Sequence, residues 1–153
     1  MNKKKIYFAG PLFNSAELAF NKKLTSMLRS LGFDVFLPQE SSSEDPINWN
    51  DAEKNPARII FERDEEAILC SDILIFVLDG RVPDEGACVE LGMAYMHKKL
   101  VKPECIIVGL KTDSRIAFAS SPLNVMVQFP LDYLATTEEK LIDYLRQVAQ
   151  ESC

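Results

Sequence analysis

Short, nearly continuous apolar runs alternate along the chain with longer stretches in which apolar residues recur every three or four positions. The runs at 5–9, 33–37, 72–78 and 104–110 are predicted strands, and the run at 72–78 is typical of a central parallel strand covered on both faces. The longer stretches are predicted helices, the first three of which end near Leu31, Leu69 and His97. This alternation indicates an α/β sandwich around a parallel sheet.

Turn and capping residues mark the ends of these elements. Gly32 follows the first helix where a left-handed residue commonly ends a helix, and Thr136 with Glu139 is predicted to form a capping box for the last helix. Residues 39–55 are predicted to form a loop over the edge of the sheet, which can include a helix of its own. The pattern assigns no structure to 124–127. Further boundaries are marked by Gly10-Pro11, Pro38 and Asn55-Pro56.

Length, charge and cysteine spacing narrow the range of functions. The 153 residues fit a single domain over 1–153. A formal net charge of −6, with the lysines and arginines scattered, disfavours binding to the phosphates of nucleic acids. The four cysteines and the one histidine show no metal-binding spacing, so neither a zinc site nor a disulfide framework is expected.

The N-terminal region begins with lysines and continues into a short apolar stretch. That stretch reaches only about six residues before Gly10, which is too short for a signal sequence or a membrane span. We therefore expect a cytoplasmic protein without a membrane partner.

Carboxylates follow the predicted central strand. Asp79, Asp84 and Glu90 come after its carboxyl end, within the next loop and helix. Carboxylates are rarely buried unless they are paired or ligating, and ligands of parallel α/β sheets bind at the carboxyl ends of the strands. The three residues therefore suggest a reactive site at this edge.

Glu90 is the strongest candidate in this group. Gly86 and Ala94 lie one helical turn before and after it, so that small side chains leave room for a ligand. Gly92 costs the helix about 1 kcal/mol relative to alanine, which indicates close approach of a ligand or of packed backbone. The alternative is a glutamate on a solvated helix face, but the apolar residues on either side of Glu90 favour a helix packed on the sheet.

The remaining candidates each have a structural alternative. Asp84 is placed either to cap the helix that follows it or to hydrogen-bond a heterocycle. Asp64 lies in a highly charged helix, where a solvated position is the alternative to a role in the site. Tyr7 is either a core residue or the partner of a carboxylate, and Phe13 is either a core aromatic or a wall on which a flat base stacks.

The chain resembles the nucleoside 2-deoxyribosyltransferase family in motifs that span nearly its whole length. The most specific of them has aspartate, glycine, glutamate, glycine and alanine at positions 84, 86, 90, 92 and 94. The matching segments are 7–13 (YFAGPLF), 71–73 (SDI), 78–80 (LDG), 83–94 (PDEGACVELGMA) and 123–126 (LNVM), together with Asp64.

The resemblance implies both a fold and a reaction. The fold is a single-domain, doubly wound, five-stranded parallel sheet in a flavodoxin-like (Rossmann-like) three-layer sandwich. The reaction moves a 2-deoxyribosyl group between nucleobases through a covalent sugar–enzyme intermediate, with no metal or cofactor. Glu90 would be the nucleophile, and Tyr7, together with the positive end of the helix, would favour its ionised form. Asp84 and Asp64 would bind the base and protonate it as it leaves.

The resemblance also implies substrate contacts from several loops and from a second subunit. Asn124 would reach the sugar 5-hydroxyl in the site of a neighbouring subunit, so a homo-oligomer is expected. The other residues expected to contact the substrate are Gly10, Pro11, Phe13, Gly86 and Met126. The expected partners are 2-deoxyribonucleosides and free nucleobases.

Other functions of similar folds fit the sequence less well. A hydrolase of the same superfamily that cuts deoxynucleoside 5-monophosphates is the nearest alternative, but the turn after the first strand offers no phosphate cradle, and only Ser120 and Ser121 could provide one. A magnesium-dependent receiver domain requires an acidic pair where Gly10-Pro11 stands. A Rossmann dehydrogenase requires a GxGxxG motif, which follows none of the predicted strands.

Overall fold

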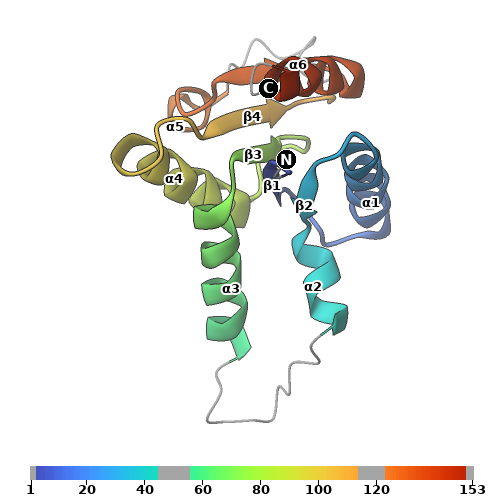
Figure 1. Cartoon of the computed structure of the whole chain (residues 1–153). Helices are drawn as coiled ribbons and strands as arrows, with labels where there is room; N and C mark the ends of the chain where they lie inside the picture. Colours follow the sequence, from blue (N-terminus) through green and yellow to red (C-terminus); the bar gives the residue numbers. More distant parts are fainter. Residues whose placement is uncertain (1–2, 45–55, 114–122, 151–153) are drawn as a thin grey trace.

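A parallel sheet of five strands forms the centre of the computed structural model, which describes residues 3–44, 56–113 and 123–150 (Figure 1). The strands lie in the order β2-β1-β3-β4-β5, which is the flavodoxin-like order of a doubly wound sheet. The predicted fold class is therefore confirmed. The strands are β1 (Lys5–Ala9), β2 (Asp34–Phe36), β3 (Ile73–Val77), β4 (Ile106–Leu110) and β5 (Tyr133–Ala135).

Helices cover both faces of the sheet and complete three layers. Buried side chains of α1 (Ser15–Ser30) and α6 (Glu138–Gln150) pack on one face. Those of α3 (Pro56–Cys70), α4 (Glu85–Leu100) and the short α5 (Val125–Gln128) pack on the other, and Figure 1 shows α3 and α4 together on that side. Each face therefore has its own apolar core.

Alternation along β1 decides which residues can reach the candidate site. Successive strand residues point to opposite faces, so Ile6 and Phe8 join the core under α1 and α6. Tyr7 and Ala9 instead join the core under α3 and α4. Tyr7 is fully buried there, and its ring stacks on Phe36 with 5.5 Å between the ring centroids. The phenol is therefore held on the side of the sheet that carries α4.

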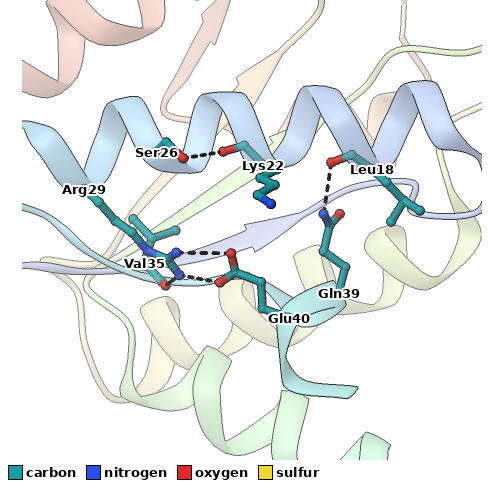
Figure 2. Close-up of polar contacts among 7 residues, drawn as sticks. All are labelled: Leu18, Lys22, Ser26, Arg29, Val35, Gln39 and Glu40. Atoms are coloured by element: carbon teal, nitrogen blue, oxygen red, sulfur yellow. Dashed lines mark hydrogen bonds and ion pairs between the residues drawn. The ribbon is translucent and has the colours of Figure 1, made fainter. Parts of the chain in front are cut away.

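The predicted loop after β2 begins with a helix, α2 (Pro38–Glu44). Pro38 starts it, which is possible because the first turn of a helix does not use the N–H that proline lacks. Arg29 of α1 donates to both oxygens of Glu40, at 3.2 and 2.7 Å, and Gln39 Nε2 donates to the Leu18 carbonyl at 3.0 Å (Figure 2). These bonds hold α2 against α1.

The caps of two helices test the predicted boundaries. Gly32 has a φ of 97°, so the predicted left-handed residue after α1 is confirmed. The predicted capping box of Thr136 and Glu139 is wrong by one residue, because Thr137 Oγ1 accepts the hydrogen bond from Lys140 N at 3.2 Å. Thr136 Oγ1 instead accepts from Lys140 Nζ at 2.9 Å.

Helix α5 and strand β5 are too short to give a recognisable hydrophobic pattern in the sequence. The pattern predicts neither α5 nor β5, which have four and three residues. A tertiary contact anchors the chain before β5, where Asp132 Oδ2 accepts a hydrogen bond from Ile107 N at 2.7 Å. The predicted cap at Asn55 and the serines at 120 and 121 lie outside the described residues. In the described part of the chain, no helix is both long enough and apolar enough to cross a membrane.

Candidate active site

A hydrogen bond joins the two residues that the sequence analysis paired. Tyr7 Oη donates to Glu90 Oε1 at 2.7 Å, although the residues are 83 positions apart. Tyr7 lies in the middle of β1, and Glu90 lies in the second turn of α4. The geometry that the family resemblance implies for this pair is therefore present.

The position of Glu90 follows from the buried stripe of α4. Ala87, Leu91 and Ala94 are buried against the sheet at helical spacing. Glu90 stands at the border of this stripe and is partly buried, so its carboxylate faces β1. The solvated alternative for Glu90 is therefore excluded.

The pKa of Glu90 is set mainly by its burial. The pKa of this carboxyl is raised from 4.5 to about 7, mainly because burial removes solvent. The bond from Tyr7 opposes the rise, and the negative charges of Asp64 and Asp84 contribute to it. The bond from Tyr7 favours the ionised form, as expected, but desolvation outweighs it, so the pKa of the carboxyl is raised overall. Burial and the Glu90 carboxylate also raise the pKa of Tyr7, so the phenol stays a donor.

Asp64 lies close enough to this pair for its charge to raise the pKa of both Tyr7 and Glu90. Its side chain is 17% exposed, so the solvated alternative does not apply. Burial raises the pKa of Asp64, and the Arg63 guanidinium opposes that rise. Arg63 Nε lies 3.5 Å from Asp64 Oδ1. The sequence analysis overlooked Arg63, although it is the one cation in the run from 62 to 66.

Asp84 is both a helix cap and a neighbour of Glu90. Its Oδ2 accepts a hydrogen bond from Ala87 N at 2.8 Å, which makes it the N-cap of α4. A Cβ on Gly86 would lie 3.2 Å from this oxygen, so glycine leaves the cap its room. The structural alternative for Asp84 is therefore correct, and its charge nevertheless acts on Glu90.

Asp79 holds a loop rather than a reactive position. Its Oδ1 accepts hydrogen bonds from Thr112 N at 2.6 Å and Asp113 N at 2.9 Å, and its Oδ2 accepts one from Thr112 Oγ1. The carboxylate therefore ties the loop after β3 to the loop after β4. The expectation that Asp79 joins Asp84 and Glu90 in a reactive group is not supported, because both of its oxygens are engaged by that loop.

The turn after β1 supplies one close-packed residue and one exposed aromatic ring. A Cβ on Gly10 would lie 3.0 Å from Val77 Cβ, so the turn requires glycine for its approach to β3. The Pro11 carbonyl accepts a hydrogen bond from the buried Asn21 side chain at 2.9 Å. Phe13 is 77% exposed, which excludes the core alternative and leaves its ring available.

Two predicted contact residues lie at the surface on α5. Asn124 is the N-cap of this helix, and its Oδ1 accepts a hydrogen bond from Met126 N at 2.9 Å. Met126 is 78% exposed.

Gly92 does not have the neighbour that was expected of it. Among the described residues, nothing lies within 4 Å of the position that its Cβ would occupy. Packed protein backbone therefore does not explain this glycine. The space beside it remains open for a ligand or a second molecule.

The assembled group has the composition of a glycosyl-transfer site. It contains one partly buried carboxylate whose pKa is raised to about 7 and two further carboxylates close by. A carboxylate beside an anomeric carbon can stabilise positive charge there and form a covalent ester. Residues 6–126 match the family described as nucleoside 2-deoxyribosyltransferase. This range contains Tyr7, Asp64, Asp84 and Glu90. The chain belongs to this family.

Relatives of this nucleoside 2-deoxyribosyltransferase family member are found among sequences and solved structures. An uncharacterized protein of Ureaplasma parvum, UU063, is 36% identical over 121 residues, which cover 76% of this chain and 75% of that protein. A conserved protein from Enterococcus faecalis V583 superposes with a TM-score of 0.75 and 30% identity, covering 95% of this chain and 99% of that one. These similarities extend beyond the site to most of the chain.

Two solved 2-deoxyribosyltransferases are similar in fold. The enzyme from Bacillus psychrosaccharolyticus has a TM-score of 0.69 at 24% identity and covers 90% of this chain and 89% of its own. The 2-desoxiribosyltransferase from Leishmania mexicana has a TM-score of 0.65 at 21% identity, with 92% and 95% covered. At these identities the likeness shows the fold alone.

Proposed function

We propose that this protein transfers a 2-deoxyribosyl group from a deoxynucleoside to a free nucleobase, with a covalent intermediate on Glu90. The observation that carries the proposal is the bond from the buried Tyr7 phenol to Glu90 in a member of this family. A bond of this kind leaves one carboxylate oxygen for attack while it fixes the direction of the other. Tyr7 thereby orients the nucleophile.

The first displacement cleaves the N-glycosidic bond. Glu90 attacks the anomeric carbon, the bond to the base breaks with its electron pair moving to the base nitrogen, and Asp84 delivers a proton to the departing base. In the second displacement, a nitrogen of the incoming base attacks the same carbon, the ester bond to Glu90 breaks, and Asp84 recovers a proton. Two displacements at one carbon retain its configuration.

Other residues of the site bind the substrate. Asp64 contacts the base, and Phe13 offers an exposed ring on which a flat base can stack. Gly10 and Pro11 shape the turn beside it, and Gly86 keeps the start of α4 free of a side chain.

A second copy of the chain completes the site. Three of the side chains around α5 are apolar and well exposed, with Val125 at 61%, Met126 at 78% and Phe129 at 84%. Apolar groups gathered in this way favour contact with another protein surface. Asn124 lies at the start of the same helix, where it can reach the sugar 5-hydroxyl in a neighbouring subunit.

The test is incubation of the protein with deoxyinosine and free adenine, followed by chromatography of the products. Deoxyadenosine is expected, and riboinosine is expected to be a poor donor. Glu90→Ala should abolish the exchange while circular dichroism shows an intact fold. Free hypoxanthine and free sugar without a new nucleoside would instead indicate the hydrolase, and exchange at the wild-type rate by Glu90→Ala would contradict the mechanism.

A further inference from the structure

Arg63 is turned toward its neighbour in the sequence, Asp64, rather than toward solvent. Adjacent residues of a helix point in different directions, so Arg63 and Asp64 do not face one another by default. Here Arg63 Nε nevertheless lies 3.5 Å from Asp64 Oδ1. Both atoms are buried, and among the described residues neither has a hydrogen-bond partner. The arginine is therefore turned toward the carboxylate beside it.

The other end of the guanidinium is anchored on α2. Arg63 Nη1 donates to the Ser41 carbonyl at 3.3 Å. That helix is itself held against α1 by the bonds of Arg29 to Glu40 and of Gln39 to Leu18 (Figure 2). A chain of polar contacts thus runs from α1 through α2 to the carboxylate of Asp64.

The charges around Asp64 come from three elements. Tyr7 of β1, Asp84 and Glu90 of α4, and Arg63 of α3 are the described titratable or charged groups that act within this cluster. Of these, Arg63 carries the one positive charge, against three carboxyl groups. Without it, a partly buried Asp64 would lose the only described opposite charge that favours its ionised form.

We propose that Arg63 is a positioning residue of the reaction, whose guanidinium, anchored on α2, holds the Asp64 carboxylate in place near Glu90. This inference rests on the proposed function and refines it. Asp64 meets the base as a hydrogen-bond acceptor, and proton donation to the leaving base falls to Asp84. Because both Asp64 and Glu90 then work ionised, the acidic limb of the pH profile reports the pair.

The test compares Arg63→Gln, Arg63→Lys and Arg58→Gln. Arg58→Gln is the matched control, since it removes one arginine from the exposed part of the same helix, where Arg58 pairs with Glu62. Two readouts are taken: the pH profile of kcat/KM for base exchange, and the titration of the Asp64 carboxyl carbon by ¹³C NMR, assigned with Asp64→Asn.

In Arg63→Gln, the Asp64 carboxyl should titrate about one pH unit higher than in the wild type, the lower end of the effect of an adjacent opposite charge. At pH values below the midpoint of the Asp64 titration, the kcat/KM for base exchange should fall about tenfold, with a smaller loss at pH 8. Arg63→Lys should retain the wild-type midpoint, and Arg58→Gln should change neither readout. If Arg63→Gln does not fold, Arg63→Met, which keeps an apolar stem, replaces it.

An unchanged Asp64 titration in the neutral variant would overturn the inference, as would equal losses in the glutamine and lysine variants. The carboxyl titration needs no substrate. If the wild-type protein shows no exchange, the proposed function fails, and the NMR result still decides whether Arg63 controls Asp64.

Discussion

Replacement of Glu90 by glutamine should make the protein more stable at high pH. The pKa of this carboxyl is about 7 in the folded protein and 4.5 in the reference state. Between these values the folded chain binds more protons than the unfolded chain, so the free energy of unfolding falls as the pH rises. Above pH 7, the folded protein carries the full cost of an ionised, partly buried carboxylate.

The difference of 2.5 between the two pKa values, 7 minus 4.5, corresponds to at most about 3 kcal/mol. Glutamine has no charge to bury, and its amide oxygen can still accept the bond from Tyr7. Glu90→Gln should therefore gain stability over the wild type progressively from about pH 4.5 to above pH 7, up to that magnitude. The wild-type protein is thus less stable at a pH at which Glu90 is ionised than at a pH at which Glu90 is protonated.

Urea unfolding followed by circular dichroism, at several pH values and one protein concentration, measures this gap. Glu85→Gln is the matched control, because it removes one carboxylate from the exposed first turn of the same helix. Wild-type and Glu90→Gln curves that stay parallel from pH 5 to pH 8 would refute the reasoning, since burial of Glu90 would then have no energetic consequence.

Three further outcomes are expected. The kcat/KM for exchange should rise with pH through about 7 as Glu90 ionises. Tyr7→Phe should move this acidic limb of the pH profile to higher pH, because the hydrogen bond that it removes favours the ionised form of Glu90. A pH profile identical to that of the wild type would contradict a role for the Tyr7–Glu90 bond. Asp84→Asn should keep thermal stability, because asparagine also caps helices, yet lose exchange, whereas Asp84→Ala should cost about 1 kcal/mol as well; full activity in Asp84→Asn would remove it from proton transfer. Gly92→Ala should gain up to about 1 kcal/mol in thermal unfolding, because no described residue is near its Cβ; reduced activity or altered assembly would show that a ligand or a second subunit uses this space.

The parts of the fold that could be predicted are those with a long local pattern. The near-continuous apolar run of β3 and the helical stripe of α4 show their burial in the sequence itself. The three residues of β5 show no such pattern, because their place is set by pairing with β4 and by the contact of Asp132 with that strand. The bounds of helix α2 could not be predicted for a similar reason, since side chains of α1 hold it.

The features of the candidate site also fall into those that could be predicted from the sequence and those that could not. Tyr7 and Glu90 could be paired because the motifs that carry them resemble those of a family, and the hydrogen bond between them is present. The charge of Glu90 could not be predicted, because it depends on how much solvent the folded chain removes. The contact of Arg63 with α2 could not be predicted either, since it brings together segments that no local spacing relates.

The most direct test of the central claim is mass spectrometry of the protein quenched with acid during reaction with deoxyinosine. We expect a fraction of the protein to carry the added mass of one deoxyribosyl group, on the peptide that contains Glu90, and to lose it when adenine is supplied. An adduct on another peptide, or rapid exchange with no adduct at any quench time, would contradict the account.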